Sequence, residues 1–72
     1  MENGEPAIQH GVIRRKEHSF AFIVRDGLRD SIFVHSVDID DSLWEILKEG
    51  NRVRFLMGFS YKGPRGFDVR KE

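Results

Sequence analysis

Five short runs of β-branched and aromatic residues, separated by turn-forming residues, constrain this 72-residue chain more than any other feature of its sequence. The runs are residues 12–16, 20–24, 32–35, 52–57 and 67–70, with Asp26-Gly27, Glu49-Gly50-Asn51 and Lys62-Gly63-Pro64 among the intervening turns. β-Branched and aromatic residues favour strands, whereas Gly, Asn, Asp and Pro favour turns. Five short strands suggest a small barrel or sandwich. A closed five-stranded barrel fits the size of the chain, because closure removes most exposed sheet edges.

The length allows one domain, which must fold by side-chain packing because the chain contains no Cys for disulfides or thiolate metal sites. We predict a flexible N-terminal tail over residues 1–7 and a domain over residues 8–72. The longest apolar run, residues 20–24, is far shorter than the ~20 residues that a membrane span needs. The acidic, polar start of the chain lacks the features of a signal peptide. We therefore expect a cytoplasmic protein without membrane contact.

The segment between the third and fourth runs carries helical signals. Ser42 followed by Glu45 resembles a capping box, and Gly50 is a stop signal. A helix would place Leu43, Ile46 and Leu47 on one face. The pattern predicts a short helical turn in residues 42–48, with an ordered loop as the alternative.

Charge is unevenly distributed although twelve basic and twelve acidic residues cancel. Residues 1–8 carry −2, residues 9–36 carry +2, residues 37–50 carry −4 and residues 51–72 carry +4. A neutral total would argue against a nucleic-acid ligand, since domains that bind nucleic acid are usually basic. Attraction of a partner depends on where the charges lie, so the two basic segments keep such a ligand open.

Aromatic residues occupy alternate positions in the second and third runs. Because strand side chains alternate between faces, Phe20 and Phe22 share one face of their run, and Phe33 and His35 share one face of the next. The opposite faces are aliphatic, with Ala21, Ile23, Ile32 and Val34. Burial of His35 would require hydrogen-bond partners for its ring nitrogens. We therefore predict that the aliphatic faces are buried and that the aromatic residues form a patch on the outside.

An exposed aromatic patch bordered by cations is typical of proteins that bind single-stranded nucleic acid, since bases stack on the rings and cations contact phosphates. Arg14, Arg15 and Lys16 lie on the preceding run, and Arg25 follows the second run. The alternative is that the aromatic residues form the core and that His35 is a buried or rim histidine.

Two motifs resemble those of the cold-shock domain family. His18-Ser19-Phe20-Ala21-Phe22-Ile23 is similar to the first ribonucleoprotein motif of that family, and Ile32-Phe33-Val34-His35 is similar to the second. The spacing from Phe33 to Phe55 matches bacterial cold-shock proteins without a gap, and Lys62-Gly63-Pro64 resembles the final hairpin loop. The resemblance covers about residues 8–70. It implies an all-β, five-stranded antiparallel OB-type barrel that binds single-stranded RNA or DNA with its aromatic face.

The resemblance also implies a set of site residues. Stacking is expected on Phe20, Phe22, Phe33 and His35, and on Trp44 as an aromatic residue of the loop. The basic residues near this face are Arg14, Arg15, Lys16, His18, Arg25 and Lys62. For Trp44, packing of the loop onto the barrel is an equal alternative. The chain departs from the family where Arg14-Arg15-Lys16 replaces the usual Lys-Trp-Phe and where Gly66-Phe67 replaces a pair of small residues.

Catalysis has little support because the sequence shows no nucleophile with a positioned base. The three His residues are widely spaced, so we expect no metal site and no cofactor. The leading hypothesis is a binder of single-stranded nucleic acid, RNA in preference to DNA, acting as an RNA chaperone or as a regulator of transcription or translation. The alternative is a protein-interaction module, or a homodimer, that uses the remaining aromatic patch on the same fold.

Overall fold

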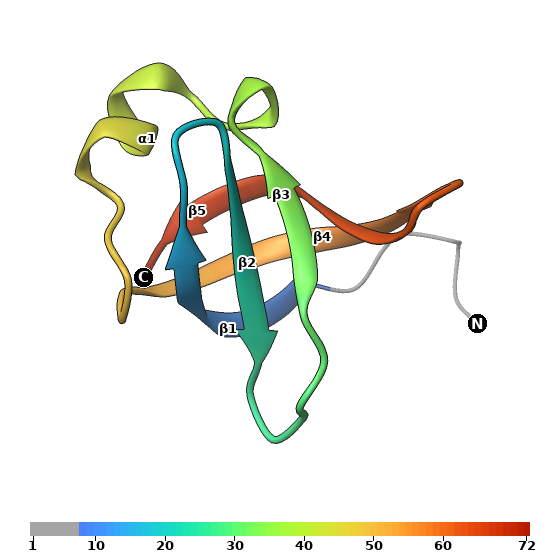
Figure 1. Ribbon diagram of the computed structural model, residues 1–72. Coiled ribbons are helices and arrows are strands. Elements are labelled where there is room, and N and C mark those ends of the chain that lie inside the picture. The colour runs from blue at the N-terminus through green and yellow to red at the C-terminus, as the bar shows by residue number, and fades with distance from the viewer. Residues whose placement is uncertain (1–7) are drawn as a thin grey trace.

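The computed structural model describes residues 8–72, which form a closed five-stranded barrel with one short α-helix at one end (Figure 1). The elements are β1 (Ile8–Lys16), β2 (Phe20–Arg25), β3 (Ile32–His35), α1 (Asp41–Ile46), β4 (Arg52–Ser60) and β5 (Gly63–Lys71). The strand order around the barrel is β1-β2-β3-β5-β4, and β4 pairs with β1 to close it. The predicted OB-type barrel is confirmed. The predicted tail over residues 1–7 lies outside the described residues.

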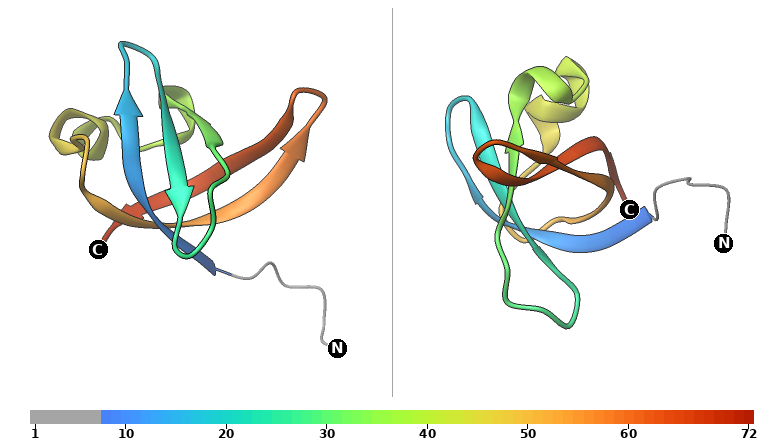
Figure 2. Two further views of the ribbon diagram at one scale, coloured as in Figure 1. Left: turned by 60° about the horizontal axis from the view of Figure 1, so that its bottom comes forward. Right: turned by 90° about the vertical axis from the view of Figure 1, so that its right-hand side faces the viewer.

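Four of the strand pairings are antiparallel, whereas β3 and β5 pair in parallel with Phe33 opposite Arg65. The hairpin of β4 and β5 is longer than the sequence predicted and extends away from the barrel (Figure 2). The turn is made by residues 61–62, so the predicted loop Lys62-Gly63-Pro64 is right for Lys62 and wrong for Gly63 and Pro64, which belong to β5. The Ser60 hydroxyl stabilises this turn by accepting from the Lys62 backbone N–H at 3.2 Å.

The barrel interior is aliphatic where β2 and β3 face it, as the alternation in the second and third runs predicted, and β4 adds the aromatic ring of Phe55. The core residues are Ile13, Ala21, Ile23, Ile32, Val34, Ile39, Leu47, Val53, Phe55 and Val69. Gly66 lets β5 pack closely on this core, because a Cβ atom there would lie 2.9 Å from Val34 Cγ2 and 3.2 Å from Phe55 Cδ2. Such distances are too short for a well-packed interior.

The connection from β3 to β4 contains a 3₁₀ turn, Ser36–Asp38, followed by α1. The predicted capping box is wrong: Asp40 is the N-cap, and the Ser42 hydroxyl donates to its carboxylate from inside the first turn. The predicted common face of Leu43, Ile46 and Leu47 is also wrong, because the helix ends at Ile46, whose side chain is 54% exposed, while Leu47 lies beyond the helix and turns into the core. Within residues 8–72, no helix is long and apolar enough to span a membrane.

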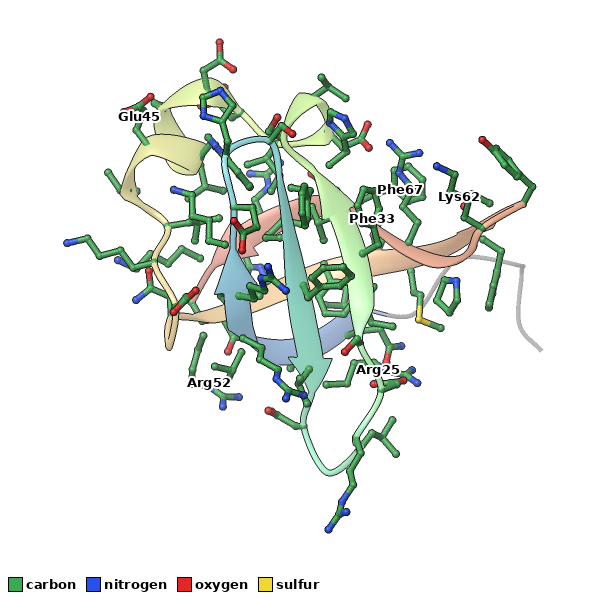
Figure 3. All side chains as sticks on the ribbon, in the orientation of Figure 1. Arg25, Phe33, Glu45, Arg52, Lys62 and Phe67 are labelled. Atoms are coloured by element: carbon green, nitrogen blue, oxygen red, sulfur yellow. The ribbon has the colours of Figure 1, made fainter. Side chains whose placement is uncertain are left out.

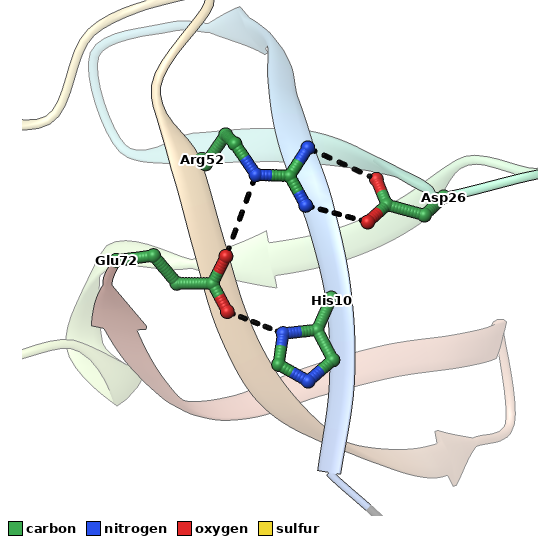
Figure 4. A network of polar contacts seen from close by, with 4 residues as sticks. All are labelled: His10, Asp26, Arg52 and Glu72. Carbon is green, nitrogen blue, oxygen red and sulfur yellow. Dashed lines mark hydrogen bonds and ion pairs between the residues drawn. The ribbon is translucent and has the colours of Figure 1, made fainter.

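A polar network borders the seam between β1 and β4 (Figure 4). Arg52 Nη2 lies 2.5 Å from Asp26 Oδ2, and Arg52 Nε lies 3.5 Å from Glu72 Oε1. Glu72 also contacts His10. The hydrogen bond from Arg52 lowers the pKa of Asp26, and the same contact raises the pKa of Arg52. Ion pairs and hydrogen bonds therefore connect four parts of the chain: β1, the turn after β2, β4 and the last described residue, Glu72.

Candidate nucleic-acid interface

The outer face of β2 and β3 carries a cluster of four half-buried rings, which we call the aromatic platform: Phe20, Phe22, Phe33 and His35. The antiparallel register sets Phe20 opposite His35 and Phe22 opposite Phe33. The ring centroids of Phe20 and Phe22 are 5.7 Å apart, those of Phe20 and Phe33 6.0 Å, and those of Phe22 and Phe33 5.9 Å. The His35 ring lies 6.2 Å from Phe33. The rings therefore gather outside the core rather than inside it.

Cations extend the platform on both sides in one row across the strands. Arg15 on β1 lies opposite Phe22, and Arg65 on β5 lies opposite Phe33. On β1 the register shifts between Ile13 and Arg15, so Arg14 and Arg15 together occupy a β-bulge beside Phe22. Both arginines are exposed, and with Phe22 and Ser31 they line a hollow of about 350 Å³. The row therefore brings two aromatic faces and two guanidinium groups onto a single surface.

A second hollow, of about 340 Å³, separates the platform from the hairpin of β4 and β5. Its lining residues are Phe22, Phe33, His35, Ser60, Tyr61, Lys62, Pro64 and Arg65. Lys62 lies at the hairpin tip, where its Nζ is 5.7 Å from the centroid of the Tyr61 ring (Figure 3). Ring faces suited to bases and an ammonium suited to phosphate therefore line the same concavity.

Lys16 and Trp44 contact each other instead of the aromatic platform. Lys16 Nζ donates to the backbone carbonyl of Trp44 at 2.5 Å and to that of Leu47 at 2.8 Å. The same ammonium lies 4.7 Å from the centroid of the Trp44 ring. Trp44 is half-buried and packs against the barrel core. These contacts attach α1 to the barrel, as the packing alternative for Trp44 expects.

Arg25 and His18 lie at opposite ends of β2. Arg25 Nε donates to Asp30 Oδ2 at 2.8 Å, and Arg25 Nη1 donates to Gln9 Oε1 at 3.3 Å. This places the Arg25 guanidinium at the loop between β2 and β3 (Figure 3). His18 is exposed in the turn between β1 and β2. Neither side chain lines the two hollows beside the platform.

Arg65 is a candidate site residue that sequence reasoning missed. Its guanidinium carbon lies 5.8 Å from the centroid of the Phe33 ring and 5.4 Å from that of Phe67, and its Nη2 is 2.5 Å from Asp38 Oδ2. The alternation of Arg65 and Phe67 along β5 could have indicated that they share a face. Their approach to Phe33 depends on the parallel pairing of β3 and β5, which no local pattern in the sequence indicates.

Comparison with known proteins identifies one family. The family model described as the 'Cold-shock' DNA-binding domain matches residues 10–72. A cold shock-like protein of Aquifex aeolicus is 34% identical over 55 residues, which cover 76% of this chain and 79% of that protein. Probable cold shock protein A of Mycolicibacterium smegmatis is 37% identical over 54 residues, covering 75% and 81%, respectively. The corresponding protein of Mycobacterium tuberculosis is 35% identical over 54 residues, with the same coverage of 75% and 81%.

Proposed function

Because this chain belongs to the cold-shock DNA-binding domain family, we propose that it binds single-stranded nucleic acid by stacking unpaired bases on the aromatic platform. The observation that carries the proposal is the platform itself, whose ring centroids lie 5.7 to 6.2 Å apart outside the core. Every base offers a π-face, and stacking on an aromatic side chain contributes about 1–3 kcal/mol per base. The activity is binding and includes no bond-making step.

Phosphate contacts are assigned to exposed cations beside the platform. Arg14 and Arg15 line the hollow next to Phe22, and Lys62 lines the hollow on the hairpin side. These positions suit a backbone that runs along the edges of the stacked bases. Lys16 and Arg25 are not assigned phosphate contacts. The ammonium of Lys16 donates to carbonyls at the end of α1, and the side chain of Arg25, held by Asp30, is only 21% exposed, against 62% for Arg15 in its ion pair with Glu17.

RNA is the proposed ligand in preference to DNA, with a role as an RNA chaperone or as a regulator of transcription or translation. This part of the proposal rests on analogy with the family. Weakly sequence-specific stacking would keep unpaired RNA from folding into unwanted hairpins. Oligouridylate and oligothymidylate of equal length are the probes that test the preference, and tighter binding of the thymidylate would contradict it.

Titration of a fluorescently labelled oligopyrimidine tests the proposed function at low and high salt, with anisotropy as the readout. We expect binding by the native chain and a loss of at least about tenfold in affinity for the double variant Phe20→Ala, Phe22→Ala. Phe59→Ala is the matched control, since Phe59 is 75% exposed and is not part of the platform. Absence of binding at low salt would overturn the proposal, as would unchanged affinity of the double variant when thermal unfolding shows it to be folded.

A protein-interaction role is the second candidate, and the hairpin favours it. Phe59 is 75% exposed and Tyr61 is 95% exposed. Large exposed apolar residues on a small domain often mark contact surfaces. Small-angle scattering over a range of protein concentrations separates the two candidates. A mass that rises with concentration and does not respond to added oligonucleotide would support this second role.

A further inference from the structure

Phe67 occupies a position on β5 that only a glycine neighbour permits. Its ring lies over Gly58 of β4, where a Cβ atom would be 2.8 Å from Phe67 Cε2 and 3.2 Å from Cδ2. Gly58 pairs with Arg65, and Phe67 is two residues further along β5 on the same face. The Phe67 side chain is nevertheless 36% exposed. The absence of a side chain at position 58 therefore seats the ring close to the hairpin backbone while leaving it accessible to solvent.

Arg65 connects this ring to the aromatic platform. Its guanidinium carbon is 5.8 Å from the centroid of Phe33 and 5.4 Å from the centroid of Phe67, so it contacts both rings. Asp38 holds the guanidinium in place through the 2.5 Å ion pair with Nη2. Figure 3 shows Phe33 and Phe67 on neighbouring strands, with Lys62 further out on the hairpin. The surface of ring faces therefore continues from β3 across Arg65 onto β5.

We propose that Phe67 is a further base-stacking position, so that a bound single strand passes from Phe22 and Phe33 over Arg65 onto β5. This inference rests on the proposed function, because it extends the same surface by one base. The two sides of the platform differ in chemistry: β1 presents the exposed Arg14 and Arg15 beside Phe22, whereas β5 presents the Phe67 ring beside Arg65, whose charge is paired with Asp38. Cations attract phosphates and rings attract bases, so this asymmetry directs the additional base toward β5.

A purely structural role for Phe67 makes a different prediction. The strand register places Phe67 opposite Leu56, which in turn lies opposite Ile8, so the three side chains form an apolar row. If packing in this row were the only role of Phe67, leucine would serve nearly as well as phenylalanine. A stacked base requires the flat π-face, which leucine lacks. Phe67→Leu therefore separates packing from stacking better than truncation to alanine.

The first test places a fluorescent reporter at the proposed position. In a Trp44→Phe background, Phe67→Trp leaves a single indole on β5, and Phe59→Trp leaves one on the opposite face of the same hairpin. Titration with oligothymidylate of about eight nucleotides, within the site sizes of OB folds, is followed by tryptophan emission. We expect quenching at position 67 and little change at position 59. Equal responses at the two positions would overturn the inference.

The second test measures affinity against oligonucleotide length. We expect Phe67→Leu to weaken binding of the longer thymidylate at least about fivefold and to leave binding of one with about four nucleotides unchanged. Phe59→Leu, the matched control, should bind both as the native chain does. If the native chain binds and Phe22→Ala loses affinity while Phe67→Leu does not, this inference fails and the proposed function stands. If the native chain binds neither oligonucleotide, the proposed function itself fails.

Discussion

Asp68 adopts a backbone conformation that few residues other than glycine tolerate, with φ at 51°. It belongs to a β-bulge, because Phe67 lies opposite Leu56 and Arg70 lies opposite Arg54, which leaves two residues of β5 facing one residue of β4. The additional residue shifts by one position the alternation of β5 side chains between the core and the outside. Gly66 and Val69 are therefore both buried, although strict alternation would place residues i and i+3 on opposite faces. Phe67 remains on the outer face. The bulge thus serves both the core and the proposed stacking position.

Substitution of Asp68 tests the importance of this conformation. We expect Asp68→Val to lower the free energy of unfolding by about 1–2 kcal/mol, because a β-branched side chain is strained in the left-handed region. Asp68→Asn should stay close to the native value, since Asn tolerates this region as Asp does. Urea unfolding followed by circular dichroism measures both variants. Equal stability of the Val and Asn variants would show that the backbone conformation carries no cost.

Residue-level predictions succeeded where the relevant information is local. The placement of Phe20 and Phe22 outside and Ile23 inside follows from alternation within one strand, and the structure has this arrangement. The surroundings of Lys16 and Arg65 could not be predicted in the same way. Each contacts a residue more than twenty positions away, so its partner depends on how the barrel closes.

At the scale of elements, α1 depends on contacts from the barrel. A helix of six residues is too short to be stable by itself in water, and its last carbonyl groups lack partners within the helix. Lys16 at the end of β1 supplies donors to the carbonyls of Trp44 and Leu47. The half-buried ring of Trp44 packs on the core beneath the same ammonium. Lys16 therefore acts as a C-terminal cap that is contributed by a strand.

Removal of the Lys16 ammonium should loosen α1. We expect Lys16→Met to lower the free energy of unfolding by about 1–2 kcal/mol, because hydrogen bonds from a charged donor are lost. The emission of Trp44 should also change, since the cation no longer lies over its ring. Lys48→Met is the control, because Lys48 is exposed just after the helix. A native emission spectrum and native stability for Lys16→Met would contradict the assignment.

The loop between β2 and β3 is tied by Arg25 and Asp30. The hydrogen bond from Arg25 lowers the pKa of Asp30 from its ordinary value of 3.8. A carboxyl group with a lowered pKa in the folded state stabilises the fold above the pKa of the unfolded state. That contribution is lost as the pH falls through the folded-state pKa. The loop should therefore weaken in acid, starting near pH ~4.

Acid titration of Asp30→Asn isolates this contribution. We expect the variant to be less stable than the native chain at neutral pH, and we expect the difference to shrink as the pH falls from about 5 to about 2. Urea unfolding at several pH values measures the difference directly. Asp26, whose pKa Arg52 also lowers, is present in both proteins and cancels in the comparison. A difference that does not change with pH would rule out the ion pair as its source.

The five strands could be predicted from sequence, whereas several strand limits, the 3₁₀ turn and the choice between helix and loop for α1 could not. All five strands lie where β-branched and aromatic runs predicted them, because those runs reflect burial of one face. The hairpin turn lies at residues 61–62 instead of the predicted 62–64, because Pro64 is part of β5 and pairs with Phe59. Ser42 is not the N-cap because the helix begins at Asp41, which makes Asp40 the N-cap, a position that Asp favours as strongly as Ser does.

At the scale of the whole molecule, many of the charges that sum to zero are paired with a neighbour of opposite sign. The ion pairs among residues 8–72 include Arg15–Glu17, Arg25–Asp30, Arg52–Asp26, Arg65–Asp38 and Arg70–Asp68. The acidic segment before β4 contributes Asp38 to this set. Its carboxylate partly neutralises Arg65 beside the aromatic platform. The cations suited to phosphate beside the platform are few: Arg14 and Lys62 are exposed there, and Arg15 is exposed but shares its guanidinium with Glu17.

Few available cations imply a shallow dependence of binding on salt. For single strands, the slope of log K against log salt is about −0.7 per neutralised phosphate, so two or three contacts predict a slope of about −1.4 to −2. Anisotropy titrations with oligothymidylate at several salt concentrations measure this slope. Lys62→Ala should make the slope shallower by about 0.7, and Lys71→Ala, at the other end of β5, should not change it. A native slope steeper than about −4 would mean that phosphate contacts outweigh stacking, contrary to the arrangement of rings and ion pairs on this barrel.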